Sequence, residues 1–361
     1  MDTGARTAIK TLYVGPLDPS GTCAARLRGL KSINEHTEAM DTSYVARRGG
    51  RLRNYLAAQI CFDYSFVEVN RSLLSNVEQF RPAIVWIDKG YWVWRSTLER
   101  IAQRGILLVH HNTDDIHAAH AKWAYRLLRS TVKYYDIHFT SNRHNLSDLA
   151  ALGARRVELT HLGYDHDRFY RRELTQSEAQ DWTNDVVFVG HWESATERHV
   201  NGLVEAGLPV KVYGAGWHHA KIKNNLRNIL GLRTLGNEDY VKCLLGARIA
   251  LCFVSKLNRN DTAARTFEIP ACGTFLLAER TGEHQRLYKE GEEADFFGDA
   301  RELIEKTRFY LAHPTARESI ADKGHVRCLS SGYSWLAQMR NDWPKVIDML
   351  GHKEGKSSVV S

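Results

Sequence analysis

The sequence predicts an α/β protein made of two halves of similar size, each built on a parallel sheet. Short apolar runs alternate with stretches of helical periodicity along most of the chain, which is typical of strand–helix–strand units. Each half also opens with an apolar run that leads into a glycine, Gly15 in the first half and Gly190 in the second. With 361 residues, the chain is long enough for two such domains.

The first half begins with the apolar run 11–14, a loop that contains Gly15 and Gly21, and a helical pattern over 23–30. The run 83–88 predicts the next strand, because it is apolar until it ends in Asp88. Ser96 and Gly105 fit the N-cap and C′ positions of the helix that follows. Further strands are expected at 106–111, 135–140 and up to residue 159, with a helix ending at Leu152.

Residues 171–184 are polar and show no strong period, so they predict a linker between domain 1–170 and domain 185–334. The alternation then restarts. Strands are expected at 185–190, 209–213 and 249–254, and helices at 198–206, 238–247 and 300–311. A last helix is expected at 335–350, followed by a polar, frayed tail at 351–361.

The most informative segment runs from Arg265 to Leu277. It places Glu268 in a short helix, stops that helix near Pro270 and Gly273, and continues as a buried apolar run. A carboxylate at this position can accept hydrogen bonds from the two hydroxyls of a ribose. The backbone just before it, at Asp261, Thr262, Ala263 and Ala264, can donate N–H groups to a diphosphate. The segment therefore predicts a nucleotide-sugar site.

Composition narrows the classes of protein to which the chain could belong. No segment approaches the ~20 apolar residues that span a bilayer, and the first ten residues lack the apolar core of a signal peptide. Six scattered cysteines without a C-x-x-C spacing fit a reducing cytoplasm. The net charge of +7 comes from bases interleaved with acids, so no nucleic-acid partner is expected, whereas peripheral membrane contact stays open. The densest basic cluster, residues 47–53, indicates a solvated face beside a loop.

His110, His111, Asp114 and Asp115 form the best polar cluster of the first half, at the expected end of a strand. A histidine there can act as a base or bind the transferred sugar. Metal binding by His110 with Asp114, or by His117 with His120, is the alternative. No tight ligand motif supports it, and no metal or other cofactor is expected.

Several motifs of the second half together resemble the CgeB-type branch of the GT-B glycosyltransferases, which is related to the large retaining family 4. The resemblance covers roughly residues 186–343. It rests on the motifs around Phe188, Gly190, Trp192, Arg198, Gly214, Gly216, Phe267, Glu268, Ala271, Gly273, 291–297, Arg317 and Gly324. It implies two Rossmann-like domains that face a central cleft, with the acceptor on domain 1–170 and the donor on domain 185–334. The helix 335–350 would cross back to the first domain.

The same resemblance implies roles for individual residues. Glu268 matches the ribose-binding glutamate, and Arg198 and Arg265 would neutralise the leaving diphosphate. The polar cluster of the first half, considered apart from the resemblance, would add His111 and Asp114 to the catalytic set. The donor contacts would come from Gly15, Gly21, Gly190, Gly214, Glu268 and residues Asn260 to Ala264. The expected reaction is transfer with retention by a cytoplasmic, metal-independent enzyme, onto a glycan, small-molecule or protein acceptor.

One position departs from the family pattern. The family carries a glutamate eight residues before the ribose-binding one, and this chain has Asn260 there. Two alternatives to transfer therefore stay open: a nucleotide-sugar 2-epimerase and a non-catalytic nucleotide-sugar-binding protein. Purely structural roles also stay open for two residues. Glu268 could form an ion pair with an arginine on a helix surface, and Arg198 could pair with Glu197 or Glu205.

Overall fold

The structure, a computed structural model, describes residues 9–47, 60, 62–118, 123–221 and 234–358. The chain forms two compact units. The first unit comprises residues 1–161, 257–259 and 335–361, and the second comprises residues 162–256 and 260–334. Most of the basic cluster, residues 48–53, lies outside the described residues, and so does His120.

The first unit contains a sheet of six strands in the order β2-β1-β3-β4-β5-β6. All neighbouring strands pair in parallel. The strands are β1 (Thr11–Gly15), β2 (Thr37–Asp41), β3 (Ile84–Asp88), β4 (Leu107–Asn112), β5 (Ile137–Thr140) and β6 (Val157–Leu159). The helices of this unit are α1 (Thr22–Ile33), α2 (Ser43–Arg47), α4 (Tyr64–Phe80), α5 (Arg95–Ala102), α6 (Arg126–Thr131), α7 (His144–Ala151) and α16 (Trp335–Ser358), with a 3₁₀ turn, η2 (Val132–Tyr134).

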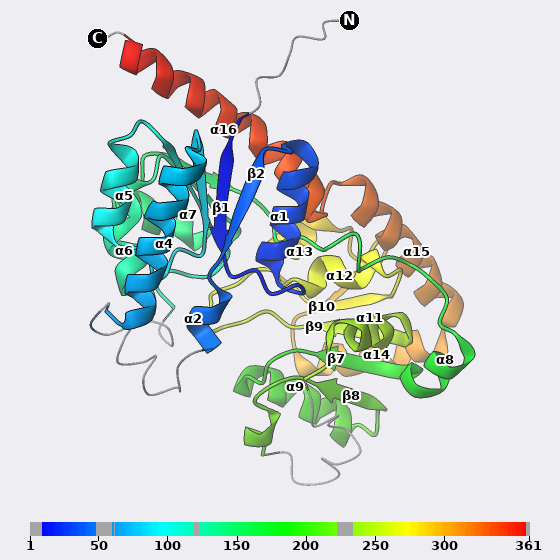
Figure 1. Cartoon of the computed structure of the whole chain (residues 1–361). Coiled ribbons are helices and arrows are strands. Elements are labelled where there is room, and N and C mark those ends of the chain that lie inside the picture. Colours follow the sequence, from blue (N-terminus) through cyan, green and yellow to red (C-terminus); the bar gives the residue numbers. More distant parts are fainter. Residues whose placement is uncertain (1–8, 48–59, 61, 119–122, 222–233, 359–361) are drawn as a thin grey trace, which may run out of the picture. The chain divides into compact units, whose positions relative to one another are not determined.

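Helices cover both faces of this sheet (Figure 1). On one face, Val14 of β1 packs in a cluster with Leu73 of α4. On the other face, Tyr13 of β1 packs with Leu30 of α1 and Met339 of α16. Adjacent strand residues thus feed two separate cores, as expected for a strand whose side chains alternate between faces.

A buried ion pair lies beneath the end of β3. Arg26 on α1 donates from Nε and Nη2 to the two oxygens of Asp88, at 2.6 and 2.8 Å, and both side chains are fully buried. The guanidinium also lies over the Trp335 ring of α16, 4.5 Å from its centroid. Tyr13 donates its hydroxyl to the same carboxylate. The pair therefore ties α1, β1, β3 and α16 together.

The second unit contains a parallel sheet of five strands in the order β11-β10-β9-β7-β8. The strands are β7 (Asn184–Val189), β8 (Val210–Tyr213), β9 (Ala247–Cys252), β10 (Leu276–Glu279) and β11 (Asp295–Phe297). The helices are α8 (Gln176–Trp182), α9 (Ser194–Glu205), α11 (Asn237–Leu245), α12 (Arg265–Ala271), α13 (Gly282–Leu287), α14 (Ala300–Ala312) and α15 (Pro314–Ser330), with a 3₁₀ turn, η3 (Trp217–His219). Two parallel α/β sheets confirm the predicted fold class.

Several element boundaries differ from expectation. The polar segment 171–184 is not a bare connection, because it folds into α8 within the second unit. Helix α5 begins at Arg95 with Trp94 at the N-cap, so Ser96 does not cap it. The last helix continues to Ser358, through most of the segment expected to be frayed.

Candidate functional site

The ends of β7 and β8 meet backbone to backbone at the carboxyl edge of the second sheet. Gly190 donates its N–H to the carbonyl of Tyr213 at 2.8 Å. Gly214 has φ +137°, and a Cβ on it would lie only 2.1 Å from the Gly190 oxygen. A side chain at Gly214 would not fit here, so the main chains of the two strand ends lie in direct contact.

The start of α12 lies at the same edge, since α12 follows β9. Thr281 anchors the approach by donating its hydroxyl to the Asp261 carbonyl at 2.7 Å. The Ala263 N–H is capped by the Thr266 hydroxyl at 3.1 Å. Within the described residues, the N–H groups of Thr262, Ala264 and Arg265 have no acceptor. Unpaired N–H groups at the start of a helix can bind an anion.

Arg265 braces this edge and keeps its positive charge. Its Nη1 and Nη2 donate to the carbonyls of Val189 and Phe253, at 2.9 and 3.2 Å, so the side chain ties β7 and β9 to α12. The guanidinium lies over the Phe188 ring, and its buried Nε has no hydrogen-bond partner in the described ranges. Among the described residues no carboxylate pairs with it. The charge expected to neutralise a diphosphate is therefore present, but two of the guanidinium N–H groups already bond backbone carbonyls.

Glu268 follows one turn later and is half-buried. Its Oε2 accepts a hydrogen bond of 2.6 Å from the hydroxyl of Tyr240 on α11. Burial raises the pKa of Glu268, and the Tyr240 hydrogen bond and the charges of Arg265 and Arg168 oppose that rise. Within the described residues Glu268 forms no ion pair, so the surface pairing with an arginine is not what the structure contains.

Arg198 is exposed on α9. It donates one long hydrogen bond of 3.4 Å to the Ser194 carbonyl. The alternative pairing with Glu197 or Glu205 is absent: Glu197 accepts from the Trp192 indole, and Glu205 from the Asn201 amide. Arg198 thus has no acidic partner in the described part of the chain.

Two carboxylates that the sequence did not single out fix the segment after β9. Glu193 accepts from the Ser255 hydroxyl at 2.6 Å and from the Lys256 N–H at 3.1 Å. Glu279, the last residue of β10, pairs with the Lys256 ammonium at 2.5 Å. The second could have been found as an acidic residue at a strand end, the position that drew attention to Asp88.

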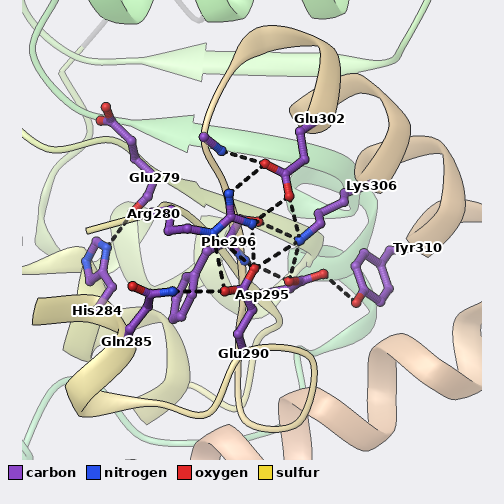
Figure 2. A network of polar contacts seen from close by, with 11 residues as sticks. Glu279, Arg280, His284, Gln285, Glu290, Asp295, Phe296, Glu302, Lys306 and Tyr310 are labelled. Carbon is purple, nitrogen blue, oxygen red and sulfur yellow. Dashed lines mark hydrogen bonds and ion pairs between the residues drawn. The ribbon is translucent and has the colours of Figure 1, made fainter. Parts of the chain in front are cut away.

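A network of ion pairs holds the chain just beyond Glu279, as Figure 2 shows. Arg280 pairs with Glu290 at 2.5 Å and with Glu302 at 2.6 Å. Lys306 on α14 contacts both carboxylates and pairs with the buried Asp295 at 2.7 Å. These contacts join β10, β11 and α14, so they fix where β10 ends.

Two glycines mark the corresponding edge of the first sheet. Gly15 ends β1, and a Cβ on it would lie 3.0 Å from the Asp88 Cβ. Gly21 is the N-cap of α1, and its N–H is bonded to the Asp18 carbonyl at 2.7 Å. The loop that they bound is small and lies against the end of β3.

The histidines of this edge are enclosed in the protein. His111 is fully buried among the rings of Trp86, Phe139 and Trp335, and neither of its ring nitrogens has a hydrogen-bond partner among the described residues. Burial holds its pKa well below the usual range. His110 is also buried and its Nδ1 lies 2.9 Å from that of His138. The structure therefore offers no accessible base at His111, because β4 turns this residue into the core.

Asp114 lies within reach of solvent and is held in an ion pair. Lys89 donates to its Oδ2 at 2.6 Å, and Tyr91 donates its hydroxyl to the same oxygen. Burial opposes the charged form, but Lys89, the Tyr91 hydrogen bond and Arg26 together outweigh burial and lower the pKa of Asp114. Lys89 has φ +70°, a strained backbone for a residue with a side chain. The neighbouring Asp115 pairs with Arg259, so the two acids have separate partners.

One group among the described residues has the composition and spacing of a metal site, and the sequence analysis did not single it out. Asp165, His166 and Asp167 each offer a ligand atom within 4.8 Å of the others. These residues are engaged in contacts of their own, since Asp167 donates its N–H to Asp165 and pairs with His166. Exposed acidic groups of this kind are common without a metal.

None of the helices in the described ranges combines the length and the apolar composition that crossing a membrane requires.

Part of the second half of the chain matches a known protein family, and the whole fold matches solved structures. Residues 194–341 match a family model described as glycosyl transferase-like. No curated protein matches the chain.

Solved structures match over nearly the whole chain. Anabaena HepE, solved in complex with UDP and glucose, has a TM-score of 0.65 at 11% identity, covering 94% of this chain and 100% of that one. Sucrose-phosphate synthase of Thermosynechococcus elongatus has a TM-score of 0.64 at 10% identity, covering 94% and 99%. A Listeria monocytogenes protein, provisionally described as UDP-N-acetylglucosamine 2-epimerase, has a TM-score of 0.54 at 12% identity, covering 89% and 94%. At these identities the matches establish a shared fold.

Proposed function

The chain carries a glycosyl transferase-like domain and has the GT-B fold, and from this premise we propose that it transfers a glycosyl group from a nucleoside-diphosphate sugar to an acceptor. The second unit holds the donor in this proposal, and the first unit holds the acceptor. The finer likeness to the CgeB branch, carried by the motifs around Gly190 and Glu268, and a cytoplasmic location are part of the same proposal.

The observation that carries the proposal is the start of α12. Among the described residues, the N–H groups of Thr262, Ala264 and Arg265 have no acceptor, and no carboxylate pairs with the Arg265 guanidinium beside them. Glu268 lies one turn along, with a carboxylate oxygen available beside the one that Tyr240 holds. A diphosphate needs N–H groups and a guanidinium, and the two hydroxyls of a ribose need a carboxylate. The start of α12 offers these groups in the order in which a nucleoside diphosphate presents its diphosphate and its ribose.

Catalysis then depends chiefly on stabilising the leaving diphosphate. The bond between the anomeric carbon and the diphosphate breaks while the acceptor oxygen bonds to the same carbon. Arg265 and the exposed Arg198 stabilise the charge that develops on the departing group. Because His111 is buried, we assign the acceptor proton to an oxygen of the leaving diphosphate, which favours transfer with retention on one face. Asp114, with Lys89, is assigned to positioning the acceptor.

A binding screen tests the donor site. Nucleoside diphosphates and their sugars are added to the protein and its melting temperature is measured. A true ligand at 100 times its Kd stabilises by about 2.7 kcal/mol. We expect Glu268→Ala and Glu268→Gln to reduce this shift, while Glu305→Gln, an exposed change on α14, leaves it unchanged. The donor assignment is wrong if no nucleoside diphosphate stabilises the protein.

Product analysis tests the reaction. Nuclear magnetic resonance of the anomeric proton in the transferred sugar is expected to show the configuration of the donor. An inverted product would rule out the retaining mechanism.

A nucleotide-sugar 2-epimerase is the second candidate, since a protein provisionally described as one shares the fold. Incubation of the donor without any acceptor separates the two reactions. Epimerisation changes the sugar of the intact nucleotide sugar, whereas a transferase gives at most slow hydrolysis to the nucleoside diphosphate.

A further inference from the structure

The hydrogen bond between Tyr240 and Glu268 suggests a role for a residue outside the proposed set of donor contacts. We propose that Tyr240 is a positioning residue that holds Glu268 so that its remaining acceptor positions select a ribose over a 2′-deoxyribose. This inference rests on the proposed donor site. Tyr240 is not part of the family motif that drew attention to Glu268, and it lies on a different helix, α11.

Tyr240 is fixed at both ends. Its ring meets the Phe169 ring edge to face, with the centroids 5.6 Å apart, and it packs against the apolar core of the second unit. Its hydroxyl donates to Glu268 Oε2 at 2.6 Å. A tyrosine that is packed along its ring and bonded at its tip has few other rotamers available, so it holds the carboxylate in one orientation.

The two oxygens of Glu268 are therefore not equivalent. Oε2 is held by Tyr240, whereas Oε1 accepts no hydrogen bond from the described residues. A carboxylate oxygen has two lone pairs, so Glu268 retains Oε1 and one lone pair of Oε2. These acceptors lie side by side on one fixed carboxylate. Two neighbouring hydroxyls, as in a ribose, match them, while a 2′-deoxyribose leaves one acceptor unpaired in a half-buried site.

Tyr240 also favours the ionised form of Glu268. The groups that act on this carboxylate are Tyr240 on α11, Arg265 on α12, Arg168 and Asp165 on the segment before α8, and the Cys272 thiol at the end of α12. Burial raises the pKa of Glu268, and Asp165 adds to that rise, whereas Tyr240, Arg265 and Arg168 oppose it. Burial keeps the Tyr240 phenol protonated, because it raises the pKa of that group well above its usual value. Loss of the hydroxyl thus leaves a carboxylate that is less fixed and easier to protonate.

The test is the substitution Tyr240→Phe, which keeps the ring and removes the hydroxyl. Its control is Tyr310→Phe, which removes a tyrosine hydroxyl that donates to Asp295 at 2.7 Å in the network of Figure 2. Calorimetry measures the affinity of each protein for UDP and for 2′-deoxy-UDP. If UDP does not bind the wild type, ADP and GDP with their 2′-deoxy forms replace it. Melting temperatures show that each variant is folded.

We expect the wild type and Tyr310→Phe to prefer the ribonucleotide by about tenfold or more. In Tyr240→Phe the affinity for the ribonucleotide falls about tenfold, the affinity for the deoxyribonucleotide falls less than about threefold, and the preference shrinks accordingly. The ribonucleotide affinity of Tyr240→Phe, relative to that of the wild type, rises with pH as Glu268 ionises. In a Glu268→Gln background, Tyr240→Phe adds little, because the two residues act through one bond.

The outcomes separate this inference from the donor site. If the wild type binds none of these nucleoside diphosphates, both proposals fail. If it binds one and Tyr240→Phe keeps both the affinity and the preference, only the role of Tyr240 is wrong. An equal loss for both nucleotides with no pH effect would show that Tyr240 merely supports the fold, which also overturns the inference.

Discussion

The buried pair of Arg26 and Asp88 allows a prediction whose size follows from the structure. Asp88→Ala removes the carboxylate and leaves the Arg26 charge with no partner in the core, since both side chains are fully buried. Loss of one member of a buried ion pair costs about 3–5 kcal/mol. The Tyr13 hydroxyl loses the Asp88 carboxylate but keeps the Cys23 carbonyl as an acceptor at 3.1 Å, so the expected loss stays within that range.

Urea unfolding followed by tryptophan fluorescence measures this loss. Six of the nine tryptophans belong to the first unit, so the signal reports mainly on the unit that contains the pair. The control is Glu305→Ala, which breaks the exposed pair with Arg301 and is expected to leave the unfolding midpoint unchanged. A second variant, Arg26→Met with Asp88→Leu, removes both charges and should recover at least half of the lost stability.

The pH dependence supplies a separate check. Burial alone would raise the pKa of Asp88, but Arg26, His111 and the Tyr13 hydrogen bond together outweigh burial and hold that pKa well below its usual range. A carboxyl with a lowered pKa in the folded state stabilises the protein fully above its unfolded pKa of about 3.9, and this contribution is lost as the pH falls further. The difference between wild type and Asp88→Ala should therefore stay constant near neutral pH and shrink below about pH 4. A loss under about 1 kcal/mol at neutral pH, or a double variant less stable than Asp88→Ala, would refute the reasoning.

Three further predictions concern the second unit. Gly214→Ala should destabilise the protein by more than about 3 kcal/mol in urea unfolding and abolish nucleotide binding, because its Cβ would lie 2.1 Å from the Gly190 oxygen. The control Gly207→Ala, at φ +72° with nothing within 4 Å of its Cβ, should cost only about 1 kcal/mol. Arg265→Lys should lower nucleoside-diphosphate affinity about tenfold by calorimetry, since a lysine cannot bond two strand ends and keep donors for a phosphate; an unchanged affinity would remove Arg265 from the site. Chelation with EDTA should change transfer less than about twofold in a radiolabelled-sugar assay, whereas a loss that Mn²⁺ restores and that Asp167→Asn reproduces would show that the group at residues 165–167 holds a catalytic metal.

The parallel sheets could be predicted because a buried strand has a local signature. The runs at β1, β3, β4, β7 and β9 are apolar, and a glycine, acidic or polar residue ends each run or follows it within three positions, so each could be recognised without its neighbours. The expected order of strand and helix then leaves few arrangements other than parallel sheets.

Among the helices that were not predicted, two illustrate signals that the sequence carries. Thr175 and Glu178 form a capping box at the start of α8, within the segment taken for a linker. Helix α4 begins after Asp63, whose side chain accepts from Ser65, and buries Phe66, Val69, Leu73 and Val77 at helical spacing. Only one face of each helix is buried, so polar and charged residues lie between the apolar positions. They interrupt the apolar pattern and make the helical period hard to recognise.

Burial and pairing across the chain could not be read from the sequence. His111 follows a strand-like run and looks available for chemistry, yet the pleat of β4 turns it among three aromatic rings. Tyr240 gave no signal at all, since its partner is 28 positions away on another helix. Asp114 and Asp115 look like one acidic pair, but each has its own cation.

The sequence by itself determined the class of fold, the place of Glu268 on a short helix after a strand, and the residue types that a nucleoside diphosphate would need. These features depend on local order, on hydrophobic period and on the few residues that start and stop helices. Only the tertiary structure decided which of those residues can act: it committed part of Arg265 to strand carbonyls, buried His111, left Arg198 exposed and placed Tyr240 against Glu268. The physical reason is that the availability of a charge or a lone pair depends on the atoms that surround it, and folding brings those atoms from distant parts of the chain.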